Sequence, residues 1–401
     1  MRLGVTGFQP ERMRQARVGR GLTLSALAQL ASLSAATVSR WESGQQKPEH
    51  DALARMAQQL NVPVAFLMSP LPIYGDQPAF FRSRSTATKE AREIALTRLQ
   101  WLNEVGVAIQ EYIELPVVNL PLFDGGNYLT LSESDIETIA LACRKEWKLG
   151  LGPISDVSLV LENAGVVLVR ESLGYINMDG LSKWFATDGR PYAFLAADKA
   201  NGVRFRFDAA HELGHLVLHR NTTGTDFHKR YAEIEAQANR FAGAFLLPAE
   251  SFAVEVSRPS LDTFLALKKR WRVSIAAMIV RSHQLGIVDQ DYATRLWKNY
   301  SARGWRRIEP MDADIPFEEA RLMPRAVDML LQSHVFDRNT LLSHLGLSQA
   351  DCESLCSLPS GSLSRKASNV VELAAIRLKS SDRSGPASGS VIPFPSSCAD
   401  A

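Results

Sequence analysis

The sequence is poor in cysteine, in net charge and in long apolar runs, and each shortage excludes a class of protein. Four cysteines in 401 residues, with no C-x-x-C pair, do not suggest a disulfide framework. No uncharged apolar stretch approaches the ~18 residues of a membrane span. The N-terminal residues MRLGVTGFQPERMRQ also lack the apolar region of a signal peptide. We therefore expect a cytoplasmic protein with no membrane contact.

The length of the chain limits the number of domains, and its net charge limits the kind of nucleic-acid surface that it can carry. A chain of 401 residues is too long for one ordinary core and predicts two or three domains. The formal net charge of +2 excludes a strongly basic or acidic protein, so any nucleic-acid surface must come from a local patch.

The most specific motif is the pentapeptide His211-Glu212-Leu213-Gly214-His215. Residues four apart lie on the same face of a helix, so His211 and His215 can hold one metal ion. Glu212 can take a proton from a water whose pKa a zinc ion lowers toward about 7. The spacing therefore predicts a zinc hydrolase site on a helix.

The residues around this motif predict alternating strands and helices. Strands are expected at the run VVLVR that follows Gly165, at Leu181–Ala186, at Tyr192–Ala197 and at Val203–Arg206. The last of these would lead directly into a metal-binding helix from about Asp208 to His219. The expected fold is therefore α+β around the site.

A third metal ligand must come from elsewhere in the chain. The position ten residues after His211, where a third histidine would stand in some zinc peptidases, is Asn221. A carboxylate from a second helix is the other common solution, and the helix expected over Tyr231–Leu247 offers Glu233 and Glu235.

Glu235 is the preferred ligand because its helical neighbours are small or polar and allow close approach of the two helices; these are Ala238, Asn239 and Ala242. Glu233 is the alternative. His219 lies one turn after His215, but a helix is too straight for three successive turns to grip one small ion. A supporting or packing role for His219 is therefore favoured over ligation.

Two blocks of this sequence resemble peptidases of the ImmA/IrrE family, namely RFRFDAAHELGHLVLH and EAQANRFAGAFLLP. By that resemblance, His211, His215 and Glu235 would bind Zn²⁺, and Glu212 would be the general base and acid. The family often has a second Glu where this chain has Gln237. The resemblance also implies cleavage of a repressor or antitoxin-like protein, often in stress, prophage or defence responses.

A second signal covers residues 11–67. Thr23 and Ser34 are good N-caps for two short helices separated by a tight turn, which predicts a helix-turn-helix. The segment TVSRWESGQQKP resembles the recognition-helix end of Cro/repressor-type (XRE) domains. By that resemblance, the helix Ala35–Glu42 would enter the major groove. The expected DNA-contacting residues are Ala35, Ala36, Thr37, Ser39, Arg40, Gln45, Gln46 and Lys47.

The local charge agrees with DNA binding, because residues 1–70 hold eight Arg or Lys against four acids. By analogy with repressor-type domains, the protein could act as a homodimer on two half-sites.

The fold class expected for the whole chain is multidomain and mainly α, with a five-helix N-terminal domain and an α+β zincin-like peptidase domain. The domains are expected in the following order: helix-turn-helix domain 8–70, linker and helical connector 71–130, metallopeptidase domain 131–290, helical C-terminal region 291–379 and disordered tail 380–401.

Two functions fit this plan. The first is a DNA-binding transcriptional regulator whose zinc-dependent endopeptidase domain cleaves a partner, with its own chain as a further candidate because the linker at 71–90 looks exposed. The second is a regulator or antitoxin whose peptidase-like domain senses a ligand or partner without catalysis. The intact Glu212 favours the first, because pure sensing would not need it.

Overall fold

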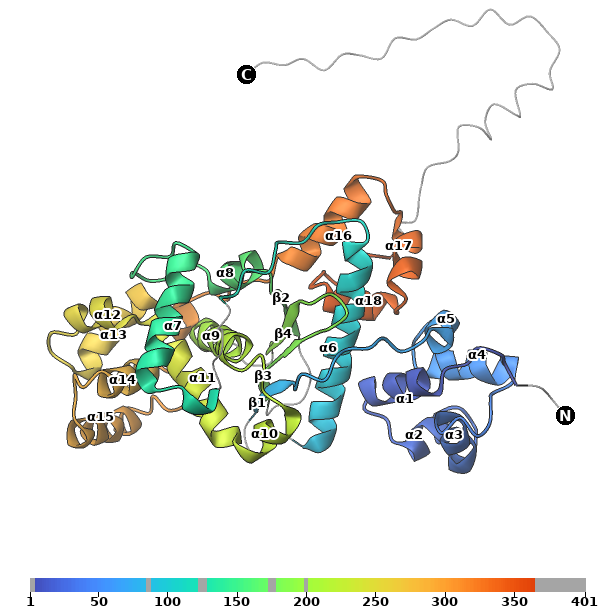
Figure 1. The fold of residues 1–401 in the computed structure, drawn as a ribbon, viewed down its shortest axis with the longest axis horizontal. Coiled ribbons are helices and arrows are strands. Elements are labelled where there is room, and N and C mark those ends of the chain that lie inside the picture. The colour runs from blue at the N-terminus through green and yellow to red at the C-terminus, as the bar shows by residue number, and fades with distance from the viewer. Residues whose placement is uncertain (1–3, 84–87, 122–127, 172–177, 198–200, 365–401) are drawn as a thin grey trace, which may run out of the picture. The chain divides into compact units, whose positions relative to one another are not determined.

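The computed structural model describes residues 4–83, 88–121, 128–171, 178–197 and 201–364 (Figure 1). The tail expected over 380–401 lies outside these residues. Within them, the chain is mainly helical with one small mixed sheet, as expected. The residues up to Leu363 pack as one compact unit. In this part of the chain, no helix combines the length and the apolar character needed to span a bilayer.

The N-terminal region contains the five expected helices, which are α1 (Pro10–Gly19), α2 (Leu24–Leu30), α3 (Ala35–Glu42), α4 (His50–Gln59) and α5 (Val64–Met68). The side chain of Thr23 caps α2 by accepting from the Ala26 backbone N–H, and Ser34 caps α3 by accepting from Thr37. Both predicted N-caps are confirmed. Each side-chain oxygen satisfies a backbone donor that the first turn of a helix leaves free.

Among the described residues, four strands form one sheet in the order β1-β3-β4-β2. The strands are β1 (Phe80–Ser83), β2 (Val167–Glu171), β3 (Met178–Trp184) and β4 (Pro191–Ala196). Strands β2 and β4 are parallel, whereas β3 is antiparallel to both of its neighbours. Three of these strands overlap expected ones, but β1 comes from the segment that was expected to be a linker.

Both faces of the sheet are covered by helices. Alternate side chains of β2 show this, because Val167 and Val169 join a core with the long helix α6 (Lys89–Gln110), whereas Leu168 joins the core beneath α9 (Gly202–Leu218). The period of two residues in a strand makes this division possible. The remaining helices before the C-terminal region are α7 (Glu133–Glu146), α8 (Val157–Asn163), α10 (Gly224–Lys229), α11 (Tyr231–Leu246) and the short 3₁₀ turn η1 (Tyr128–Thr130).

The strand expected at Val203–Arg206 is wrong, because these residues form the first turns of α9. The helix begins after Asn201, whose side chain accepts from the Arg204 backbone N–H. Apolar and basic residues alternate in VRFRF, as in a half-buried strand, but Arg206 is only 1% exposed and donates to the carbonyl of Ile154. A helix that is buried nearly all round can carry this pattern as well as a strand can.

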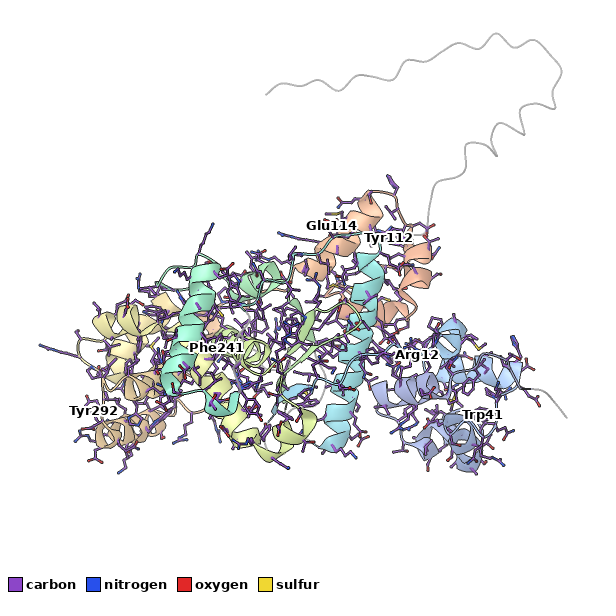
Figure 2. The ribbon with its side chains drawn as sticks, in the orientation of Figure 1. Arg12, Trp41, Tyr112, Glu114, Phe241 and Tyr292 are labelled. Carbon is purple, nitrogen blue, oxygen red and sulfur yellow. The ribbon has the colours of Figure 1, made fainter. Side chains whose placement is uncertain are left out.

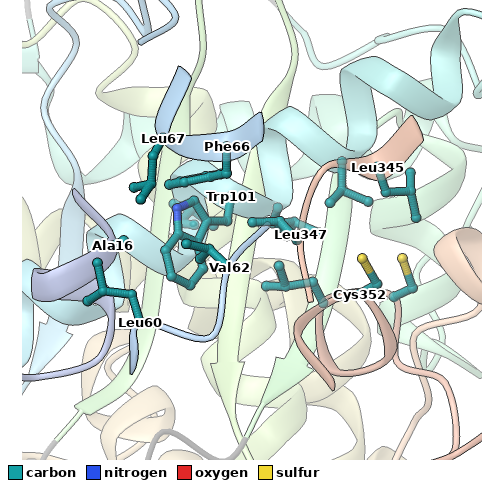
Figure 3. Close-up of a cluster of buried hydrophobic side chains, with 14 of the residues drawn as sticks. Ala16, Leu60, Val62, Phe66, Leu67, Trp101, Leu345, Leu347 and Cys352 are labelled. Atoms are coloured by element: carbon teal, nitrogen blue, oxygen red, sulfur yellow. The ribbon is translucent and has the colours of Figure 1, made fainter. Parts of the chain in front are cut away.

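The C-terminal helices pack on two sides of the sheet and its covering helices. They are α12 (Ala249–Glu255), α13 (Leu261–Trp271), α14 (Ile275–Gln284), α15 (Gln290–Ala302), α16 (Leu322–Gln332), α17 (Arg338–Leu345) and α18 (Gln349–Leu355), with the 3₁₀ turn η2 (Asp312–Asp314) between α15 and α16. Figure 3 shows Trp101 of α6 within a cluster of buried side chains from α1, α5 and the α17–α18 region. Arg12 of α1, which is labelled in Figure 2, is buried. It forms an ion pair with Glu104 of α6 at 2.8 Å.

Candidate metal centre

Two neighbouring helices bring the predicted ligands together. His211 and His215 lie one turn apart on α9, and Glu235 lies on α11. The Nε2 atoms of the two imidazoles are 3.0 Å apart. One Glu235 oxygen is 3.2 Å from His215 Nε2, and the other is 3.5 Å from His211 Nε2. These three side chains form the cluster of possible metal ligands found within the described residues.

The close approach of the two helices depends on small residues. A Cβ added to Gly214 would lie 3.2 Å from both the Cα atom and the carbonyl oxygen of Ala238, so a side chain at position 214 would push the helices apart. Ala238 and Ala242 are fully buried at the contact. The small face expected on the second helix therefore meets α9 as anticipated, and it lies beside Glu235.

Hydrogen bonds fix which nitrogen of His215 carries a proton. Gln237 donates from Nε2 to the carbonyl of Tyr128 at 2.8 Å, so its Oε1 accepts from His219 Nε2–H, also at 2.8 Å. Burial and the neighbouring His215 lower the pKa of His219 to about 3, so this imidazole is neutral and its Nδ1 is an acceptor. It therefore accepts from His215 Nδ1–H at 3.1 Å. The lone pair of His215 Nε2 is left facing the cluster.

His211 is oriented in the same way by a residue of α11. Its Nδ1 lies 3.0 Å from the Asn239 side-chain oxygen, which can only accept, so the proton is on Nδ1. Two imidazole lone pairs therefore face each other across 3.0 Å. Such an arrangement is unfavourable without a cation between the nitrogen atoms.

The donor set fits zinc. Two ligand atoms at 2.0–2.1 Å from a tetrahedral zinc ion are about 3.3 Å apart, close to the separations of 3.0, 3.2 and 3.5 Å. One oxygen of Glu235, Oε1, is buried without a hydrogen bond among the described residues. Two imidazoles and one carboxylate also leave a fourth position open, which is typical of catalytic zinc sites.

Glu212 lies on the side of α9 that faces β3. Ser182 donates to its Oε2 at 2.6 Å, while Oε1 is buried and has no hydrogen bond to any described residue. Burial raises the pKa of Glu212 well above its usual range. A Cβ at Gly180 would lie 2.4 Å from Oε1, so a glycine is needed for this approach. One oxygen of the Glu212 side chain is thus held by a hydrogen bond, and the other has none among the described residues.

The alternative ligand and the additional histidine lie outside the cluster. Glu233 is half-exposed and forms an ion pair with Arg230 at 3.0 Å. His219 supports His215 through its Nδ1 and does not meet the other ligand atoms.

Three contacts of the site were missed by the sequence analysis. Ser182, Phe80 and Arg82 all lie at the site, and the latter two belong to β1. Phe80 stacks on His215 with ring centroids 4.8 Å apart. The two adjacent phenylalanines at 80 and 81 were the only sign in the sequence that this segment is a strand.

The DNA-binding residues expected on and after α3 are mostly exposed. Thr37 is half-buried, whereas Ala35, Ala36, Ser39, Arg40, Gln45, Gln46 and Lys47 are exposed. Val38 and Trp41 point into the core and hold the helix. One polar face of α3 therefore remains exposed, outside the core of the N-terminal helices.

The positive charge of this region is smaller at the surface than the sequence suggested. Three arginines of α1 and its C-cap, which are Arg12, Arg17 and Arg20, form ion pairs with Glu104, Glu42 and Asp351. Their charges are largely neutralised within the chain. Any phosphate contact must therefore rely on other residues, such as Arg40 and Lys47.

Comparison with known families agrees with both parts of the structure. Residues 13–67 match a family described as a helix-turn-helix, and residues 161–283 match the Peptidase M78 family, described as an IrrE N-terminal-like domain. The comparison with curated proteins found no match to this chain. The second match spans α9 and α11, which carry the His211, His215 and Glu235 cluster. The chain therefore carries an XRE-type helix-turn-helix domain at its N-terminus and an IrrE-like domain of the Peptidase M78 family behind it.

Proposed function

We propose that this DNA-binding regulator is also a zinc-dependent endopeptidase. In this proposal His211, His215 and Glu235 hold the metal ion, and Glu212 is the general base and acid. The observation that carries it is the convergence of two imidazole lone pairs and one carboxylate within hydrogen-bond distances. A structural role alone would not require two lone pairs to face each other.

Each side chain of the site has its own role in the proposed hydrolysis of a peptide bond. A bound zinc ion supplies Lewis acidity, which activates water and polarises a carbonyl group. Glu212 takes the proton from the attacking water at its free Oε1 and passes it to the leaving amine. Ser182 keeps Glu212 in place through Oε2, and Asn239 and His219 keep the two imidazoles in the tautomer that binds metal.

We infer the cellular role from the combination of domains. The helix-turn-helix would bind a double-stranded operator through the exposed face of α3, as a homodimer if it follows other repressor-type domains. The substrate would be a repressor or antitoxin-like protein in the cytoplasm, in a stress, prophage or defence response. Cleavage of the chain's own linker is a further candidate.

One observation favours a second function, in which the domain senses a partner without turnover. Strand β1 lies against the metal-binding helix, and Phe80 is stacked on His215. In a site covered in this way, displacement of β1 by a partner would change the surroundings of His215, and the domain could sense the partner through this change. In a pure sensor, however, the buried and oriented Glu212 would have no chemical task.

The test compares zinc content and proteolysis in three proteins. By elemental analysis, we expect about one zinc ion per chain in the wild type and in Glu212→Gln, and loss of zinc in His211→Ala. Cleavage of the candidate repressor, or of quenched-fluorescent casein as a general substrate, should be lost in both variants. Equal cleavage by wild type and Glu212→Gln would contradict the proposal, and zinc without any cleavage would favour the sensor.

A further inference from the structure

The edge strand β1 runs along the metal centre. It pairs antiparallel to β3, with Phe80 opposite Ser182 and Arg82 opposite Gly180. Ser182 donates to Glu212, and Gly180 leaves room for Glu212 Oε1 because it has no Cβ. The strand therefore occupies the sheet edge nearest the proposed general base.

Hydrogen bonds also hold the segment before β1 against β3 and the residues that follow it. Ala186 donates its backbone N–H to the carbonyl of Tyr74 at 3.1 Å, and Lys183 donates from Nζ to the carbonyl of Gly75 at 3.2 Å. From the other side, the Tyr231 hydroxyl of α11 donates to the carbonyl of Phe81 at 3.3 Å. A segment that connects two parts of the chain is thus bound as an extended peptide.

Two side chains of β1 contact the helix that carries the metal ligands. Phe80 is 1% exposed, and its ring is nearly parallel to that of His215, at an angle of 8°. Arg82, two residues on, forms an ion pair with Asp208 at 2.7 Å and lies over the ring of Phe207. Because residues two apart share a face of a strand, α9 contacts an aromatic and a basic side chain together.

We propose that the edge of β3 is a docking site for an extended peptide, and that β1 is the chain's own occupant of this site. The preferred ligand is a segment with a large aromatic or apolar side chain followed two residues later by a basic one. The proposal rests on the proposed function, because it names the class of peptide that the endopeptidase site would bind. It also names β1 as the segment that restrains that site. Addition of a strand to a sheet edge supplies affinity through backbone hydrogen bonds and specificity through alternate side chains.

The covalent connection of β1 to the chain makes it a strong competitor. A segment held on a short linker acts at an effective concentration on the order of millimolar. A separate peptide should therefore bind poorly to the wild type and better to a protein whose β1 is weakened. Arg82→Ala removes the ion pair with Asp208 but leaves the packing of Phe80 on His215.

The test measures peptide binding rather than turnover. The probe is a fluorescein-labelled peptide with the sequence of residues 75–83, GDQPAFFRS, and the protein is the full chain carrying Glu212→Gln to prevent hydrolysis. By fluorescence anisotropy, adding Arg82→Ala should tighten binding by about tenfold, which corresponds to ~1.4 kcal/mol. A peptide with alanine in place of the aromatic at position 80 and the arginine at position 82 should not bind. Ile73→Ala, an exposed change in the same segment, should leave the affinity at its starting value.

A second measurement needs no change in β1. Hydrogen exchange of the Glu212→Gln chain is followed with and without saturating peptide. The amides of residues 80–83 should exchange faster with peptide present, while those of β4 should not change. Unchanged exchange in β1, or equal binding of the alanine peptide, would overturn the proposal. Strand exchange without any cleavage by the wild type would refute the endopeptidase alone, and cleavage without strand exchange would refute the docking site alone.

Discussion

At the scale of single residues, the candidate metal centre depends on which nitrogen atoms of three histidines carry protons. His219 is neutral because it is buried, and Gln237 accepts its one proton. His215 must then donate from Nδ1, which leaves its Nε2 facing His211 and Glu235. Gln237 is itself held in this orientation, because its side-chain nitrogen donates to the carbonyl of Tyr128.

Gly180 provides a test at this scale. Gly180→Ala would place a Cβ 2.4 Å from Glu212 Oε1, and the buried carboxylate has little space in which to move. We expect zinc content to stay near that of the wild type while the rate of peptide cleavage falls at least tenfold. Gly152→Ala, at a position with nothing within 4 Å of the added Cβ, is the matched control. Similar cleavage rates for both variants would show that the contact does not position Glu212.

At the scale of secondary-structure elements, a buried carboxylate joins α8 to α16. Glu162 accepts at one oxygen from the backbone N–H groups of Arg321 and Leu322, both at 2.8 Å. Burial raises its pKa from 4.5 to about 7, although these hydrogen bonds oppose the shift. In the folded protein, Glu162 therefore keeps its proton at pH values where the unfolded chain has lost it.

This shift predicts a pH-dependent stability. Between about pH 4.5 and pH 7 the folded state binds more protons than the unfolded state, so the free energy of unfolding falls as pH rises through this range. The contribution of Glu162 is at most about 3 kcal/mol. In Glu162→Gln, the decrease in melting temperature between pH 5 and pH 7 should be smaller than in the wild type. The exposed Glu250→Gln should retain the full decrease, and an equal slope in Glu162→Gln would refute the assignment.

At the scale of the whole molecule, one carboxylate ties the N-terminal helices to the rest of the unit. Asp351 of α18 lies 2.8 Å from Arg20 Nη1 at the end of α1 and 3.2 Å from Arg98 Nη1 of α6. Arg98 also pairs with Glu171 at the end of β2. Arg20 and Arg98 also lie over the ring of Trp101, at 5.0 and 5.9 Å from its centroid. Trp101 belongs to the apolar cluster that Figure 3 shows.

Removal of the shared carboxylate should loosen this contact. Asp351→Ala would remove the common partner of Arg20 and Arg98, whereas Arg98 would keep its pair with Glu171, so we expect a cost of about 1–3 kcal/mol. We expect a clearly lower melting temperature, and by calorimetry an earlier separate transition for the helix-turn-helix. Asp262→Ala breaks an exposed pair with Arg303 and should change little. If both variants melt like the wild type, the contact does not hold the two parts together.

The sequence by itself determined the features that depend on neighbours in the chain. The spacing of His211 and His215 places both imidazoles on one helix face, and Thr23 and Ser34 begin their helices because capping is local. The apolar β-branched run at β2 also indicated a strand. These signals act over a few residues, so they can be recognised without knowledge of the fold.

The tertiary structure decided everything that depends on distant partners. It brought Glu235, and not Glu233, to the two imidazoles; it made β1 a strand on the edge of β3; and it neutralised Arg17 and Arg20, whose acids lie far away in sequence. It also made the alternating segment at 203–206 part of a helix, in which the buried Arg206 donates to the carbonyl of Ile154 in the loop before α8. Burial and pairing arise only when remote segments meet, and hydrophobic periodicity along the chain does not record them.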